Sequence, residues 1–227
     1  ILKRSESYIG TLIDDLVTKG TEEPYRMMTS RSEYRLLLRQ DNADRRLTPI
    51  GYRLGLVPEE RMQAVAEKYA AVEAEIYRLE HTGIPGSREL NRLLTERGSA
   101  AVTDGARLID LLRRPQMTYD ELMTFDPHAP ALPKAVREQV EISVKYEGYI
   151  RRQLSQVEEF EKLEQHALPA DADYASIQGL RLEAREKLNA VRPLNLGQAS
   201  RISGVSPADM GALMIYLEKR GGKNERN

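Results

Sequence analysis

Arginine is concentrated in one short stretch of a chain whose charges otherwise balance. Between Tyr25 and Arg53 there are seven arginines, three acidic residues and no lysine, whereas the whole sequence has 34 basic and 35 acidic residues. The guanidinium group is a planar fork that binds phosphate or carboxylate through two parallel hydrogen bonds, which a lysine ammonium cannot do. The stretch therefore has the chemistry of an anion-binding site. The alternative is pairing inside the chain, with Asp41, Asp44 or the Asp14–Asp15 pair, and the residues alone leave both interpretations open.

Local sequence signals predict how these arginines are displayed. Ser30 and Glu33 have the spacing of a helix capping box, which predicts a helix over 30–39. On that helix Arg31, Arg35 and Arg39 would lie within about 80° of one another, on a different face from the apolar residues Tyr34, Leu37 and Leu38. We expect a basic stripe beside an apolar seam. Thr48 followed by Pro49 predicts the start of a further helix.

The remaining sequence predicts an all-α fold with many helices. Helix-forming residues dominate, Trp is absent and Phe occurs only twice. A first helix is expected from Ser5 to Thr18, with an apolar stripe along it, and longer ones over 58–80 and 134–166. Three short helices over 174–220 would form a small terminal subdomain. We expect three parts: an arginine-rich segment at 1–57, a helical domain at 58–170 and the terminal subdomain at 171–227.

Several kinds of chemistry have no support in the sequence. There is no cysteine, no G-x-G-x-x-G dinucleotide motif and no nucleotide-binding P-loop. The histidines, His81, His128 and His166, have no metal-ligand spacing. We therefore expect no catalytic, cofactor-binding or metal-binding residue in this chain. No apolar run is long enough to span a membrane, so a cytoplasmic location is expected.

A second set of basic residues lies near the C-terminus. Ser206, Pro207 and Asp209 predict a capped helix, and Gly204 precedes it as a turn, which together suggest a helix–turn–helix. Few side chains in "ADMGALMIYL" could read DNA bases, so contacts with a nucleic-acid backbone are the better prediction. The basic residues that could make them are Arg201, Lys219, Arg220, Lys223 and Arg226.

Two long sequence words resemble one known family. "YIGTLIDDLVTKGTEEPYRMMTSRSEYRLLLRQDNADRRL" and "LGQASRISGVSP" resemble the C-terminal region of the GidA/MnmG family. These proteins are FAD-containing subunits of the enzyme that, with the GTPase MnmE, adds (carboxymethyl)aminomethyl groups to carbon 5 of the tRNA wobble uridine. The resemblance implies FAD and NADH bound mainly outside this chain, which by itself would not be catalytic. It also implies a homodimer that forms a heterotetramer with MnmE.

The resemblance favours tRNA as the anion. The expected tRNA-binding residues are Arg26, Arg31, Arg35, Arg39, Arg46, Arg201, Lys219 and Arg220. Glu183 resembles a family acid near a helix start and is the candidate for partner binding. Two alternatives stay open: a freestanding helical adaptor that binds only protein, and a helix–turn–helix nucleic-acid binder.

Overall fold

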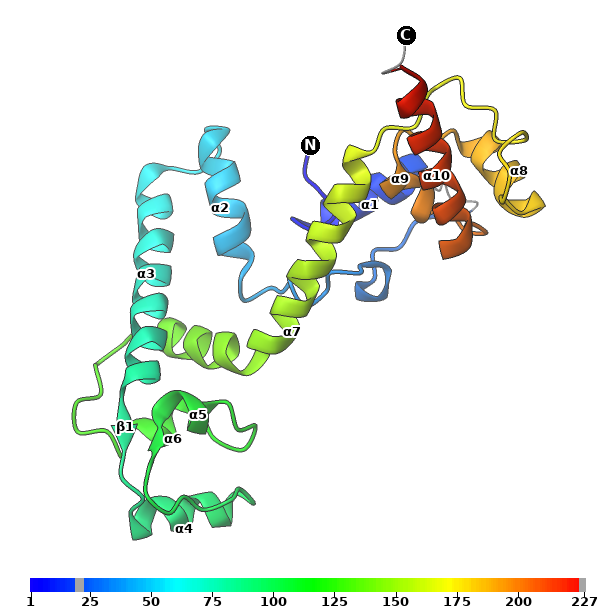
Figure 1. Cartoon of the computed structure of the whole chain (residues 1–227). Helices are drawn as coiled ribbons and strands as arrows, with labels where there is room; N and C mark the ends of the chain where they lie inside the picture. Colours follow the sequence, from blue (N-terminus) through cyan, green and yellow to red (C-terminus); the bar gives the residue numbers. More distant parts are fainter. Residues whose placement is uncertain (19–22, 225–227) are drawn as a thin grey trace. The chain divides into compact units, whose positions relative to one another are not determined.

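The structure is a computed structural model that describes residues 1–18 and 23–224, with the side chains of 221–224 outside the description. Helices dominate it, as the sequence predicts (Figure 1). The helical elements are α1 (Tyr8–Thr18), η1 (Thr29–Arg31), α2 (Ala43–Arg53), α3 (Glu59–His81), α4 (Arg88–Glu96), α5 (Leu108–Leu112), α6 (Tyr119–Met123), α7 (Lys134–Gln165), α8 (Leu182–Val191), α9 (Leu196–Ser200) and α10 (Pro207–Asn224). A two-stranded antiparallel ladder pairs β1 (Gly83–Ile84) with β2 (Ala106–Arg107).

The chain divides into two compact units. The first combines residues 1–37 with 152–227, and the second contains residues 38–151. Helix α7 contributes its first part to the second unit and its last part to the first. Each unit has its own apolar core, and each is described here by itself.

The core of the second unit forms where α3, α4, α5 and α6 meet the first half of α7. Fully buried leucines from α3, α4 and α5 fill it, together with Met117 and Val140. Helix α2 runs alongside α3, where Asp44 accepts hydrogen bonds from Lys68 and Tyr69 (Figure 1). These contacts orient α2. Because packing against a neighbouring helix stabilises it, α2 needs little intrinsic helix propensity.

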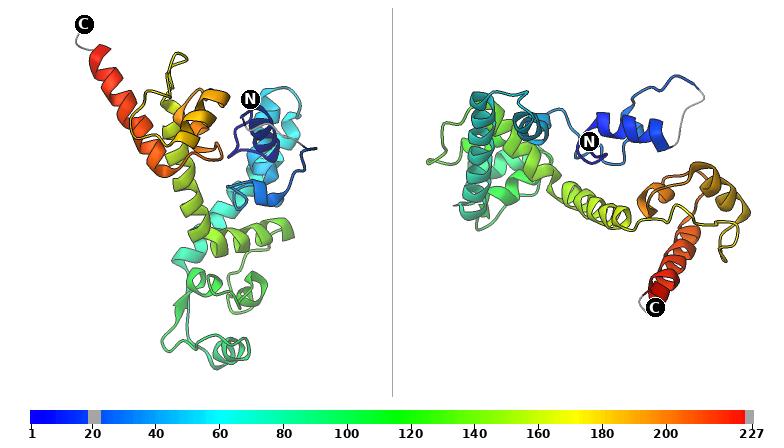
Figure 2. Two further views of the ribbon diagram at one scale, coloured as in Figure 1. Left: turned by 90° about the vertical axis from the view of Figure 1, so that its right-hand side faces the viewer. Right: turned by 90° about the horizontal axis from the view of Figure 1, so that it is seen from above.

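The core of the first unit lies in the terminal bundle, where α9 packs against α10 (Figure 2). Helix α10 starts with the predicted capping box: Ser206 Oγ accepts from Asp209 N at 3.3 Å, and Asp209 Oδ2 accepts from Ser206 N at 2.8 Å. Gly204 precedes it with φ 97°, a conformation that favours glycine. Although α8 and α9 are short, as predicted, α10 has 18 residues and is longer than expected.

Two helix predictions near the arginines are wrong. Helix α2 begins at Ala43, so Pro49 lies inside it rather than at its first position. The contacts of Asp44 with α3 outweigh the hydrogen bond that an interior proline removes. The capping box at Ser30 and Glu33 does not form either, and residues 32–39 make turns in place of a helix.

Candidate nucleic-acid interface

At residues 33–37 the contacts of a side chain from α7 take the place of a hydrogen bond of the expected helix. In a helix the Leu37 N–H would bond to the Glu33 carbonyl. Here the Gln153 amide stands between the two groups: Nε2 donates to Glu33 O at 2.9 Å, and Oε1 accepts from Leu37 N at 3.1 Å. Leu37 N also donates to the Tyr34 carbonyl at 2.9 Å, so both backbone groups are satisfied without a helix. The arginines accordingly do not form the predicted helical stripe.

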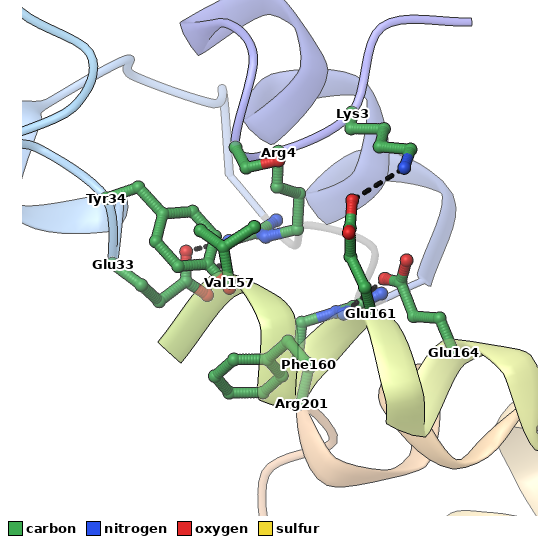
Figure 3. A pocket seen from close by; sticks show the side chains of 10 residues that line it. Lys3, Arg4, Glu33, Tyr34, Val157, Phe160, Glu161, Glu164 and Arg201 are labelled. Atoms are coloured by element: carbon green, nitrogen blue, oxygen red, sulfur yellow. Dashed lines mark hydrogen bonds and ion pairs between the residues drawn. The ribbon is translucent and has the colours of Figure 1, made fainter. Parts of the chain in front are cut away.

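The Glu33 carboxylate has a partner that the sequence did not reveal. Arg4 Nη2 donates to both Glu33 oxygens at 2.9 Å (Figure 3). Arg4 Nη1 donates to Asp15 at 2.7 Å and to Asp14 at 3.0 Å. The Arg4 side chain is 7% exposed. Burial opposes its charge, but the hydrogen bonds and charges of Glu33 and Asp15 outweigh burial and raise the pKa of Arg4. Arg4 therefore links the turn at residues 33–37 to α1 and neutralises the charge of Glu33.

Three predicted arginines of the first unit are exposed on this turn and the chain before it: Arg26, Arg31 and Arg35. The Arg31 guanidinium lies over the Tyr25 ring, 4.6 Å from its centre. Tyr25 in turn donates its hydroxyl proton to Asp15 at 2.7 Å, and burial together with this bond raises the pKa of Tyr25. Within residues 1–18 and 23–224, neither Arg26 nor Arg35 forms an ion pair.

The two predicted arginines of the second unit have defined partners. Arg39 pairs with Asp41 at 2.9 Å and lies 5.8 Å from the Tyr146 ring centre. Arg46 donates to Asn42 Oδ1 at 2.9 Å and to the Arg39 carbonyl at 3.1 Å. Internal pairing with Asp41, one of the two open interpretations, therefore applies to Arg39.

Arg201 lies in the same buried network as Arg4. It donates to Glu164 at 3.0 Å and to Asp14 at 3.3 Å, and its side chain is 8% exposed (Figure 3). Asp14 thus joins Arg201 of the terminal bundle to Arg4 near α1. In this position Arg201 has a structural role, and little of its side chain is accessible to an RNA phosphate.

The other C-terminal basic residues lie along α10. Lys219 is exposed, and Arg220 bonds to both oxygens of Asp171, at 2.9 and 2.8 Å, and to the Tyr216 hydroxyl at 2.9 Å. Arg226 and the side chain of Lys223 lie outside the described residues. Arg220 therefore stabilises the bundle while its side chain stays partly accessible.

Glu183 is exposed in the first turn of α8, where a carboxylate complements the helix dipole. Its carboxylate lies against Gly204, because a methyl group added there would meet Glu183 Oε1 at 2.7 Å. Asp209, beside this turn, is buried and accepts from Arg181 Nη2 at 2.7 Å. The Arg181 hydrogen bonds outweigh the effect of burial and hold the pKa of Asp209 well below its usual range.

Sequence reasoning did not identify Arg4, Gln153 or Asp209 as parts of these networks. Gln153 could not have been found, since a lone glutamine on a helix is an ordinary surface residue and its contacts are 116 and 120 positions away. Arg4 carries a signal in the sequence, because it lies within eleven positions of the Asp14–Asp15 pair to which it donates.

Comparison with known proteins shows which family has this arrangement. A family model described as "tRNA modifying enzyme MnmG/GidA C-terminal helical domain" matches residues 59–154. A second, described as "tRNA modifying enzyme MnmG/GidA C-terminal helical bundle", matches residues 156–227. The chain belongs to the MnmG/GidA family. The resemblance stated from the sequence words is thereby confirmed, as is the all-α fold class.

Relatives in the MnmG/GidA family match nearly the whole chain. The tRNA uridine 5-carboxymethylaminomethyl modification enzyme MnmG of Caldicellulosiruptor saccharolyticus is 55% identical over 225 residues, 98% of this chain and 36% of the relative. The enzyme of the same name from Geobacillus thermodenitrificans is 54% identical over 219 residues, 96% of this chain and 35% of the relative. A crystal structure of Aquifex aeolicus GidA superposes with TM-score 0.73 at 42% identity, covering 95% of this chain and 33% of that one. The chain thus corresponds to the C-terminal helical region and spans about a third of the length of these MnmG/GidA relatives.

Proposed function

We propose that this chain is the tRNA- and partner-binding region of a tRNA-modifying enzyme of the MnmG type. That enzyme, acting with the GTPase MnmE, would install (carboxymethyl)aminomethyl groups at carbon 5 of the wobble uridine of tRNA. FAD and NADH would be bound mainly by the part of the longer relatives that this chain does not span. The chain would contribute binding and positioning, and the names of the relatives support the reaction class.

One observation carries the tRNA proposal: Asp14, Asp15 and Glu33, three acidic residues around the arginine turn, already have partners. Arg4 holds Glu33 and Asp15, and Arg201 shares Asp14 with it. Arg26 and Arg35 are left with no ion pair in the described part of the chain. Exposed guanidinium groups on a braced turn can bind phosphates bidentately at a small cost in ordering entropy.

The second unit offers a complementary kind of contact. Tyr146 and Tyr149 lie on one side of α7, with ring centres 6.4 Å apart, and both are exposed. The Arg39 guanidinium lies over the Tyr146 ring, and Arg46 donates to the Arg39 carbonyl. Exposed aromatic rings next to arginines are typical of surfaces that stack unpaired RNA bases. This supports Arg39 and Arg46 as tRNA-binding residues.

The test uses the full-length polypeptide carrying Arg26→Ala, Arg31→Ala and Arg35→Ala. We expect tRNA affinity to fall by about tenfold or more and the salt dependence of binding to weaken by about one unit for each lost phosphate contact. Arg88→Ala is the control, because Arg88 is an exposed arginine on α4. Unchanged affinity in the triple variant would remove these arginines from the interface.

Substituting Arg35→Lys tests geometry apart from charge. Lysine keeps the positive charge but loses the two-pronged donor, so affinity is expected to fall while the salt dependence stays almost unchanged. Full affinity in this variant would show that Arg35 acts only through its charge.

We propose that Glu183 contacts the GTPase partner. It is exposed, and its position against Gly204 fixes it beside the turn that joins α9 to α10. In the full-length protein, Glu183→Lys is expected to weaken capture of MnmE, whereas Glu186→Lys, an exposed glutamate on the same helix, is expected to leave it intact. Equal effects of the two changes would contradict a specific role.

A further inference from the structure

Helix α1 turns its polar side inward and its apolar side outward. The buried residues of the helix are Gly10, Thr11 and Asp15. The residues of its apolar stripe are exposed: Ile9 at 60%, Ile13 at 45%, Leu16 at 43% and Val17 at 78%. The sequence predicts this stripe, and an amphipathic helix normally buries such a stripe against its own core.

Buried contacts lock α1 in this orientation. Asp15 and the Thr11 carbonyl both accept hydrogen bonds from Arg4, at 2.7 and 3.2 Å. Gly10 faces the backbone of the N-terminal residues so closely that a methyl group would lie 2.2 Å from the Lys3 carbonyl oxygen. Rotating the helix to bury its apolar side would separate the Arg4 charge from Asp14 and Asp15 and leave it only its pair with Glu33, which is the more costly arrangement.

The exposed stripe continues into a cleft of about 360 Å³ in the first unit. Its apolar lining comes from α1 and from the residues that precede it: Ile1, Leu2, Ile13 and Val17. Asn195 and Gln198 contribute part of its polar edge. Contiguous apolar surface with a polar rim is typical of a contact surface rather than of a solvated helix.

The relatives indicate what covers this surface. The matching family models describe C-terminal regions, and the relatives are nearly three times as long as the matched part. In these relatives an N-terminal part accompanies the C-terminal region that the chain matches. The four exposed residues of the stripe carry no charge, which suits a permanent contact within one polypeptide better than a transient contact between proteins.

We propose that the outer face of α1, formed by Ile9, Ile13, Leu16 and Val17, is the surface against which an apolar patch of the N-terminal part packs. The inner face of the same helix positions Arg31, because Asp15 holds the Tyr25 hydroxyl and Arg31 lies over the Tyr25 ring. One side of α1 therefore contacts the N-terminal part, and the other side contacts residues near the exposed arginines. The exposed arginines thus lie at the border of the N-terminal part. This packing does not depend on tRNA binding. Only the meaning of the arginines' position, as part of a tRNA-binding surface, rests on the proposed function.

The experiment compares hydrogen exchange in the full-length polypeptide and in the chain of residues 1–227. We expect the amides of α1 to exchange at least tenfold more slowly in the full-length protein. Ile13→Lys with Val17→Lys is expected to abolish that difference while leaving the thermal unfolding of the shorter chain unchanged. Leu54→Lys with Leu56→Lys is the matched control, because both leucines are exposed and lie outside α1.

Three outcomes would overturn the proposal. One is equal exchange of α1 in the two proteins. Another is full protection in the double-lysine variant. The third is concentration-dependent dimerisation of the shorter chain that the double-lysine variant abolishes, which would assign the face to a second copy. The triple arginine variant separates the two proposals, because it is expected to lose tRNA affinity while α1 stays protected.

Discussion

Gln153 occupies the place of a helical hydrogen bond at Glu33. Its amide donates to the Glu33 carbonyl at 2.9 Å, across 120 positions of sequence. The same amide accepts from Leu37 N, which also donates to the Tyr34 carbonyl, so one side chain contacts both ends of the turn that displays Arg35. A single residue of α7 therefore braces the arginine turn, together with Arg4.

Gln153→Leu is expected to loosen this turn without unfolding α7. The Glu33 carbonyl would lose its Gln153 donor, whereas Leu37 N would keep its bond to the Tyr34 carbonyl, and an unsatisfied buried polar group costs about 1–3 kcal/mol. Hydrogen exchange should accelerate at 33–37 while the α7 amides remain protected, and tRNA affinity should fall with the loss of a fixed turn. Gln153→Glu provides a control, because the carboxylate still accepts from Leu37 but cannot donate to Glu33. An unaltered exchange rate at 33–37 in both variants would contradict the assignment.

Arg4→Met is expected to destabilise the first unit more strongly. Removing the guanidinium leaves Asp15, which is also buried, without its principal ion-pair partner, and breaking such a pair typically costs about 3–5 kcal/mol. Chemical denaturation of the full-length protein measures the loss. Lys3→Met is the matched control, since the Lys3–Glu161 pair is largely exposed and should contribute little. Comparable losses from the two variants would mean that burial of Arg4 does not matter.

Arg201→Ala separates a structural role from an RNA-binding one. Because Arg201 joins Asp14 to Glu164 in a nearly buried position, we expect a lower midpoint of thermal unfolding. The affinity of the folded protein for tRNA should stay within about twofold, since no phosphate contact is lost. A large loss of affinity with unchanged stability would restore Arg201 to the tRNA-binding set.

The Asp209 carboxyl group is expected to make the stability of the terminal bundle depend on pH. Hydrogen bonds from Arg181 and Ser206 lower its pKa in the folded state from the ordinary value of 3.8. A carboxyl group with a lowered folded-state pKa contributes stability that is complete above its unfolded pKa and is lost as the pH falls through the folded value. The difference in unfolding free energy between the wild type and Asp209→Asn should therefore be constant above about pH 5 and shrink as the pH falls towards 2. A difference that persists unchanged at pH 2 would show that the Asp209 charge is not responsible.

Features that depend on neighbouring residues could be predicted from the sequence. The long helices α3 and α7 follow from apolar residues at spacings of three and four, and the structure gives them as Glu59–His81 and Lys134–Gln165. The capping box of Ser206 with Asp209 forms as expected, and Thr118 with Glu121 forms another, because each needs only one turn of chain. The family, too, could be identified from two sequence words.

Contacts between distant residues could be known only from the tertiary structure. The capping box at Ser30 and Glu33 has the same local signal as the other two, yet Arg4 takes the Glu33 carboxylate and Gln153 takes its carbonyl. The apolar stripe of α1 was equally visible in the sequence, but its outward orientation follows from the buried charge of Arg4. Local spacing determines which elements can form, whereas the pairing of buried charges and backbone groups decides which of them do form and which way they face.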